Sequence, residues 1–136
     1  MSWENEYKSK LTTAEKAVEL IKSGNRVVIG HACAEPSYLV DAMVANAESY
    51  HDVEIVHMVA MGKAGYAQPG MESHFRHNAL FVGGTTRKAV AEGRGDYTPC
   101  FFYRIPSLFT NGSLPVDVAL VQATPPDENG NMSLGI

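Results

Sequence analysis

The sequence predicts an α/β fold, with an open, mostly parallel sheet and helices on both faces. Continuous β-branched runs at 26–29 and 116–121 are typical of strands that are buried on both sides. Stretches with helical spacing alternate with these runs over short connections, which favours right-handed β-α-β crossovers. The chain has 136 residues and no visible internal repeat or linker, so we expect 1–136 to form one domain.

The first expected helix has a capping box at its start. Thr12 is the predicted cap, and Glu15 reaches back to it. Gly24 ends this helix, in which apolar residues recur with helical spacing at positions 14, 17, 18 and 21. The strand at 26–29 follows. Proline is favoured in the first turn of a helix, so a second helix is expected from Pro36 to about residue 47.

The remaining expected elements are shorter. In chain order they are a strand at 53–58, a short helix or turn at 71–77, a strand-like run at 79–82, a helix at 86–92, and strands at 100–103 and 116–121. Asn129-Gly130 is a strong hairpin signal, so the chain is expected to end inside a strand. We therefore expect this sequence to be truncated.

Composition and charge argue against several classes of protein. Hydrophobic residues make up 45% and charged residues 19% of the chain, which is ordinary for soluble globular proteins. The net charge of −4 gives no reason to expect nucleic acid or an anionic membrane as a partner. No apolar run approaches the roughly 20 residues of a membrane span, and the first residues do not form a secretory signal. Cys33 and Cys100 form neither a disulfide framework nor a metal-type pair, so a cytoplasmic location is expected.

In parallel sheets, ligands bind where strands end and helices begin. The first such junction is Gly30–Pro36, where small residues let a ligand approach the backbone and the helix start offers free amide donors. Its candidate substrate-binding residues are Gly30, His31, Ala32, Cys33, Ala34 and Glu35. The alternative is that Glu35 only caps the helix while Cys33 packs inside. Nothing in the sequence marks Cys33 as an activated nucleophile.

The second junction runs from Gly83 to Arg87. Gly84, Thr86 and Arg87 are candidate substrate-binding residues, because a glycine turn before a helix start can hold a phosphate or carboxylate and Arg87 supplies a charge. The P-loop lysine and the G-x-G-x-x-G pattern are both absent, so no nucleotide-binding motif is matched. A tight turn with a capping threonine is the alternative.

Three further patterns are weaker. Asp127 and Glu128 are adjacent in a Pro-rich turn sequence, which favours a structural turn over an acid/base pair. His74 and His77 have H-x-x-H spacing without a third ligand, so no metal site is expected. The segment 93–97 is interpreted as an anion-binding turn or as a loop braced by an Arg–Asp pair.

Taken in order, these segments resemble the acetyl-CoA hydrolase/transferase family, and within it the CoA-transferases that act on 4-hydroxybutyrate or on butyrate and acetate. The match extends over nearly the whole chain. The residues that carry it are Gly30-His31 with Glu35-Pro36; His57-Met58 with Gly62 and Tyr66; Phe75 with His77-Asn78; Gly83-Gly84 with Thr86-Arg87-Lys88-Ala89-Val90; Gly93-Arg94 with Asp96 and Pro99-Cys100-Phe101-Phe102; and Pro125-Pro126-Asp127-Glu128 with Gly130 and Ser133-Leu134-Gly135.

The resemblance implies a longer protein of two similar α/β halves with the active site between them. The family's catalytic glutamate and main CoA-binding glycine loop belong to the second half. That glutamate forms an acyl-glutamyl anhydride and then a glutamyl-CoA thioester. No catalytic residue is therefore expected in this chain, and coenzyme A is a substrate, so no cofactor is expected.

For this half the resemblance implies one wall of the pocket. His31 would contact the acyl or carboxylate group, and 32–34 would leave room for a short chain. The implied partners are acyl-CoA, a short-chain carboxylate, the missing carboxy-terminal half and further copies in a homo-oligomer. The 136 residues alone are expected to be inactive. The alternatives are an acyl-CoA hydrolase of the same family, or a non-catalytic ligand-binding or interaction domain.

Overall fold

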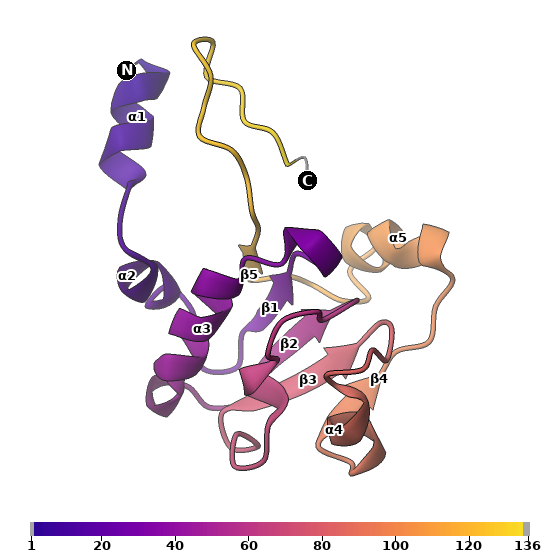
Figure 1. Cartoon of the computed structure of the whole chain (residues 1–136). Helices are drawn as coiled ribbons and strands as arrows, with labels where there is room; N and C mark the ends of the chain where they lie inside the picture. Colours follow the sequence, from indigo (N-terminus) through magenta and orange to yellow (C-terminus); the bar gives the residue numbers. More distant parts are fainter. Residues whose placement is uncertain (1, 135–136) are drawn as a thin grey trace.

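The strands of the sheet all run parallel, as the sequence predicts. The computed structural model describes residues 2–134. Within them the strands are β1 (Arg26–Ile29), β2 (Val53–His57), β3 (Phe75–Ala79), β4 (Gly95–Tyr97) and β5 (Val118–Leu120). They lie in the order β4-β3-β2-β1-β5, and each neighbouring pair is parallel (Figure 1). β1 therefore lies between β2 and β5.

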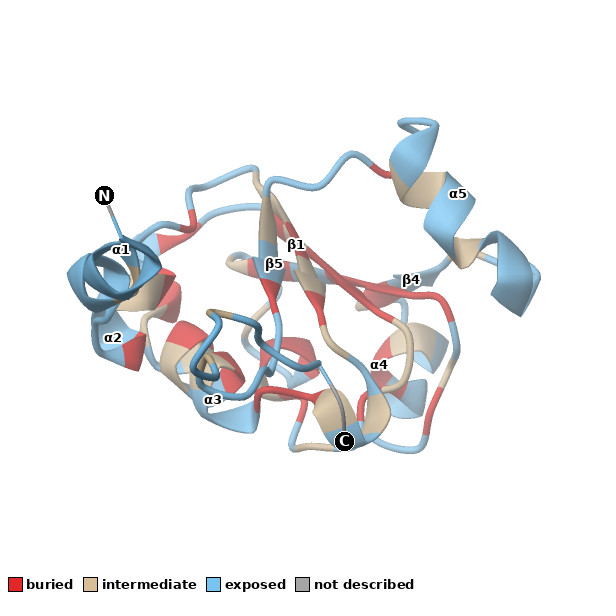
Figure 2. Ribbon diagram, turned by 90° about the horizontal axis from the view of Figure 1, so that it is seen from above, coloured by how far each residue is buried: buried red, intermediate tan, exposed pale blue. Residues whose placement is uncertain are grey.

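Helices cover both faces of this sheet. The α-helices are α1 (Trp3–Lys10), α2 (Ala14–Val18), α3 (Ser37–Ala45), α4 (Arg87–Ala91) and α5 (Ile105–Thr110). The 3₁₀ turns are η1 (Ala32–Ala34), η2 (Ala47–Ser49), η3 (Gly65–Ala67) and η4 (Phe102–Arg104). Seen from above, α2, α3 and α4 lie on one side of the sheet and α5 on the other (Figure 2), which confirms the predicted fold class. No helix within residues 2–134 combines the length and apolar character needed to cross a membrane.

Each face of the sheet has its own apolar core, because successive strand residues point to opposite sides. The larger core joins strand residues to α2 and α3 through Val27, Ile29, Val53, Ile55, Phe75, Val18, Val40 and Met43. The smaller core joins the other face to α5 through Val28, Val56, Leu80, Ile105 and Leu108. Burying a large apolar side chain contributes about 1.5–3 kcal/mol, so the α3 side supplies most of the apolar stabilisation.

A ladder of polar side chains crosses the α5 face of the sheet. Arg26 Nε donates to Glu54 Oε2 at 2.7 Å, and Asn78 Nδ2 donates to Glu54 Oε1 at 2.7 Å. Thr98 Oγ1 in turn donates to Asn78 Oδ1 at 2.8 Å. Partly buried polar groups are tolerated where they find such partners. The ladder therefore links the chain around β1, β2, β3 and the end of β4.

The structure corrects the predicted position of the third strand. The turn expected around 71–77 is present only at 72–74, and the strand expected at 79–82 is wrong, because β3 spans Phe75–Ala79. This strand includes His77 and Asn78, which are buried. His77 Nδ1 lies 3.2 Å from the Ile55 carbonyl oxygen. The hydrogen-bond partners of His77 and Asn78 lie on the neighbouring strand β2. A search for apolar runs therefore misses this strand, because its polar residues are stabilised by contacts that the local sequence does not show.

The segment 93–97 was also misassigned by the sequence pattern. It contains β4, and the expected Arg–Asp brace within it is wrong. Asp96 pairs with Arg76 on the neighbouring strand, with 2.6 Å between Oδ1 and Nη2. Arg94 instead pairs with Glu92, with 2.7 Å between Nη2 and Oε2. A cross-strand partner for Asp96 becomes visible only when the register of β3 and β4 is known.

Two smaller expectations also fail. The strand expected at 100–103 is absent, and the chain there enters η4 and then α5. At the first helix Thr13, not Thr12, is the cap, and its hydroxyl accepts from Lys16 N at 3.4 Å. Thr13 accepts from the amide three residues after it, as a cap does, so the capping prediction is displaced by one residue.

The segment after β5 is a turn, as expected. The Asp127 carboxylate accepts from the backbone amides of Asn129 at 2.9 Å and Asn131 at 2.8 Å. These bonds lower the pKa of Asp127. Thr124 N donates to Ser133 O at 2.9 Å across the turn. No strand forms between 121 and 134, and residues 135–136 of the expected terminal strand lie outside the described residues.

Asn78→Ala should lower the free energy of unfolding by about 1–3 kcal/mol, because it leaves Thr98 and Glu54 each short of one partner. Urea unfolding of the variant and the wild type would measure the difference. Asn5→Ala, on the exposed face of α1, is the matched control and should change it by less than about 0.5 kcal/mol. Equal effects of the two substitutions would contradict this role for the ladder.

Candidate functional site

The candidate site lies at the carboxyl ends of the strands. β1 connects forward to β2 on one side and has β5 on its other side, so the chain changes direction between β1 and β5. In open α/β sheets such a switch point is where ligands bind. Gly30 follows β1 there, and its amide donates to Leu120 O of β5 at 2.9 Å. A Cβ at Gly30 would lie 2.8 Å from the Ala34 carbonyl oxygen, so this close turn requires glycine.

The exposure of side chains alternates along the loop after β1. His31 and Cys33 are exposed, Ala32 and Ala34 are half-buried, and Glu35 is buried. The loop forms η1, with Ala32 at a left-handed φ of 55°. The alternative in which Cys33 packs inside is therefore wrong. The contact of this loop with a ligand stays a prediction, and His31 and Cys33 are the side chains that face solvent.

Glu35 does not cap the helix that follows it. Pro36 occupies the cap position of α3, and the Glu35 carboxylate points to the loop after β2. Its Oε2 accepts from the Met61 amide at 3.0 Å and from the Gly62 amide at 2.9 Å. A side chain at Gly62 would overlap this carboxylate. The capping alternative is thus wrong, and the buried carboxylate joins two strand-end loops.

His57, the last residue of β2, lies beneath this carboxylate. Its Nε2 is 3.9 Å from Glu35 Oε2, and its Nδ1 is 2.8 Å from the Tyr66 hydroxyl. Burial lowers the pKa of His57 from 6.5 to about 4, and the Glu35 charge opposes only part of this shift. Burial also raises the pKa of Tyr66, so its phenol stays protonated. The imidazole is therefore neutral at physiological pH and forms no ion pair with Glu35.

The loop after β3 contacts the same central segment. Thr85 Oγ1 donates to the Ala60 carbonyl oxygen at 2.8 Å. Gly84 and Arg87 are exposed, whereas Thr86 is buried and its hydroxyl has no hydrogen-bond partner among the described residues. Thr86 occupies the cap position of α4 without a side-chain cap bond. Binding by Gly84, Thr86 and Arg87 stays a prediction.

The segment 59–62, after β2, joins the two predicted loops. It is bonded to the first loop through Ala32 N and Val59 O at 2.9 Å and through Glu35, and to the second loop through Thr85. We therefore treat the three loops as one candidate wall. Sequence reasoning missed this middle segment, although Gly62 shortly after a predicted strand end was a usable signal.

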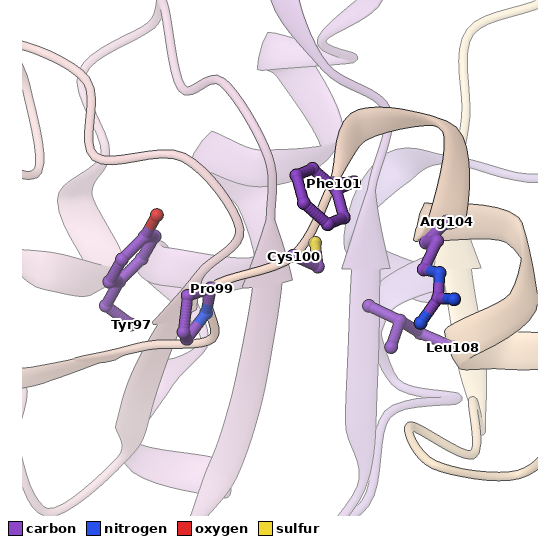
Figure 3. Close-up of a pocket in the computed structure, with 6 residues that line it drawn as sticks. All are labelled: Tyr97, Pro99, Cys100, Phe101, Arg104 and Leu108. Carbon is purple, nitrogen blue, oxygen red and sulfur yellow. The ribbon is translucent and has the colours of Figure 1, made fainter.

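An apolar hollow of about 500 Å³ lies where the chain passes from β4 into η4 and α5. Figure 3 shows Tyr97 and Pro99 on one side, Arg104 and Leu108 on the other, and Cys100 and Phe101 between them. A second hollow of about 270 Å³ shares Cys100 and is lined by Met58, Val59, Leu80, Phe81, Phe102 and Ile105. Phe101 and Phe102 are 69% and 73% exposed, so this surface is unusually apolar.

The structure separates the two histidines of the H-x-x-H pattern. His77 is buried in β3, whereas His74 precedes the strand and its Nδ1 lies 2.9 Å from the Tyr50 carbonyl oxygen. Among residues 2–134, no group of three or more His, Cys, Asp or Glu side chains is arranged to hold a metal ion. The pattern therefore has structural roles in the described chain.

An open parallel sheet with its loops joined at a switch point is an α/β domain of the type in which ligands bind at the strand ends. Comparison with known proteins makes the class specific. A family model described as "Acetyl-CoA hydrolase/transferase N-terminal domain" matches residues 1–136. The chain belongs to the acetyl-CoA hydrolase/transferase family.

Similar proteins are CoA-transferases by name. The chain is 60% identical to the 4-hydroxybutyrate coenzyme A transferase of Clostridium kluyveri, over 100% of this chain and 32% of the relative. It is 36% identical to the succinyl-CoA:acetate/propanoyl-CoA:succinate CoA transferase of Fasciola hepatica, over 91% of this chain and 26% of the relative. The chain thus spans about a third or less of these relatives.

Solved structures share the fold. The 4-hydroxybutyrate CoA-transferase of Porphyromonas gingivalis superposes with a TM-score of 0.78 at 32% identity, covering 99% of this chain and 30% of that one. RipA from Yersinia pestis gives 0.90 at 25% identity, covering 99% and 34%. The expected resemblance to an amino-terminal CoA-transferase domain is confirmed.

Gly62→Ala should lower the free energy of unfolding by about 1–3 kcal/mol, because the added methyl group overlaps the buried Glu35 carboxylate. Thermal or urea unfolding would measure this. Gly84→Ala is the matched control, since a Cβ there meets nothing within 4 Å. If both variants unfold alike, the close packing around Glu35 is not a constraint.

Stability should fall as the pH drops from about 6.5 to about 4, partly because of His57. Its pKa is lower in the folded than in the unfolded chain, so protons favour the unfolded chain across this window, by up to about 1.4 kcal/mol per pH unit. His57→Gln should flatten this dependence in urea unfolding curves. His51→Gln, at an exposed position, is the control and should follow the wild type. Parallel profiles for His57→Gln and the wild type would contradict the assignment.

Proposed function

We propose that this chain is the amino-terminal domain of an acyl-CoA:carboxylate CoA-transferase that uses 4-hydroxybutyrate, or butyrate and acetate. The observation that carries the proposal is 60% identity to a 4-hydroxybutyrate coenzyme A transferase over the whole chain. The joined loops at the carboxyl ends of β1, β2 and β3 support it, because they offer a built wall where ligands bind in such sheets.

In the proposed reaction, a glutamate outside this chain attacks the acyl-CoA carbonyl carbon and expels CoA thiolate. The thiolate then attacks the glutamyl carbonyl of the anhydride, which releases the acyl carboxylate and leaves a glutamyl-CoA thioester. The incoming carboxylate reverses these two steps and departs as a new acyl-CoA. Coenzyme A is thus a substrate. Within this chain, exposed His31 contacts the acyl or carboxylate group.

We propose that the second half of the longer protein completes the pocket. Its existence is supported by the share of 32% that this chain covers in the Clostridium kluyveri relative. The exposed aromatic surface at Phe101 and Phe102 is a candidate contact for that half, because such a surface is costly to leave in water. Assembly into a homo-oligomer and a cytoplasmic location stay predictions; the free thiols of Cys33 and Cys100 are compatible with the latter.

The full-length protein should convert acetyl-CoA and 4-hydroxybutyrate into acetate and 4-hydroxybutyryl-CoA, measured by chromatography and mass spectrometry. Residues 1–136 alone should give no turnover, because the attacking glutamate is absent from them. Borohydride added with acyl-CoA should reduce the thioester and modify one glutamate of the second half, found by peptide mapping. Free CoA released without need for an acceptor would indicate a hydrolase instead. Turnover by residues 1–136 would contradict the proposal.

A further inference from the structure

We infer that Glu35 is a positioning residue that fixes the backbone of the loop after β2 and so makes the strand-end loops one rigid pocket wall. The inference rests on the proposed function for the identity of the pocket. Glu35 itself touches no ligand in this assignment, because its side chain is buried and its Oε2 is already bonded to two amides.

The two bonds to the Glu35 carboxylate are strong. Both bonds from Met61 N and Gly62 N end on one carboxylate oxygen, at 3.0 and 2.9 Å. Hydrogen bonds to a charged acceptor are roughly twice as strong as neutral ones. A buried carboxylate without them would be costly, so the loop and the side chain hold each other in place. The turn at 61–62 is thus set by a residue 26 positions earlier in the chain.

The buried imidazole of His57 lies next to the Glu35 carboxylate. His57 Nε2 lies 3.9 Å from Glu35 Oε2, which is too far for a hydrogen bond, and it has no hydrogen-bond partner among the described residues. A carboxylate can only accept, so its charge favours the imidazole proton on Nε2. Nδ1 then accepts from the protonated Tyr66 hydroxyl at 2.8 Å. In this Glu35–His57–Tyr66 array, a hydrogen bond joins His57 to Tyr66 of the α3-face core, and the Glu35 carboxylate lies next to the imidazole without a hydrogen bond to it.

The loops after β1 and β3 also bond to the segment 59–62. Ala32 N bonds to Val59 O, and Thr85 Oγ1 bonds to Ala60 O, so the segment 59–62 is fixed on both sides. Removing the Glu35 carboxylate frees the 61–62 end of the segment while the other bonds remain. The expected result is a looser wall on a folded domain.

Hydrogen–deuterium exchange of the full-length protein tests the tie directly. Glu35→Ala should accelerate exchange of the 61 and 62 amides roughly tenfold or more, because their acceptor is lost. Glu35→Gln should accelerate it less, since an amide oxygen still accepts. Glu54→Gln, a partly buried carboxylate on the opposite face of the sheet, is the control and should leave these amides unchanged. Unchanged exchange in both Glu35 variants would overturn the inference.

Kinetics on the same variants test the positioning role. Glu35→Ala should raise the KM for the carboxylate acceptor several-fold with kcat per folded enzyme affected less, and Glu35→Gln should restore part of the loss. A role limited to stability would lower Tm while leaving KM unchanged, and that result would overturn the inference. If Glu35→Ala fails to fold, Glu35→Gln carries both measurements. If the wild type transfers no CoA, the proposed function fails, while the exchange result still decides whether Glu35 holds the loop.

Discussion

The bond between the Glu35 carboxylate and two backbone amides constrains the rest of the candidate site. A buried charge is stable only where its oxygens are bonded, and here the amides of Met61 and Gly62 supply the donors. This requirement brings the loop after β2 against the loop after β1 and excludes any side chain at Gly62. The position of the carboxylate also sets the environment of His57 below it. A change to any one of these residues therefore alters the other three.

Burial of neutral polar groups is the second constraint. Histidine is neutral at low energetic cost, so its ring can be buried in a core where a lysine or aspartate could not. His57 reaches Tyr66 through Nδ1, and His77 reaches the Ile55 carbonyl oxygen through its own Nδ1. Through these contacts, polar side chains are buried in the core and at the strand ends without forming an ion pair. Their stability consequently depends on pH in the range where an unfolded histidine titrates.

The sequence was sufficient for elements whose signal is local. β1, β2, β5 and α4 follow from apolar runs and glycine boundaries, and they were placed within one or two residues of their observed bounds. β3 and β4 were misplaced because the partners of their polar residues come from other strands. For the same reason, the sequence predicted the first loop of the candidate site but assigned Glu35 to helix capping or ligand contact. Its actual partners are 26 and 27 positions away and become neighbours only through the parallel pairing of β1 with β2.

The structure also separates two tasks within one loop. His31 and Cys33 face solvent, while Glu35 faces inward and its Oε2 accepts from two backbone amides. Substitutions at the outward residues should cost the fold little, because these residues bear no buried charge and fill no core space. Substitution of the inward residue should cost more, since its loss exposes two amides and leaves a void beside Gly62. A substitution at an outward position would thus change the surface chemistry of the proposed wall while the Glu35 bonds keep its shape.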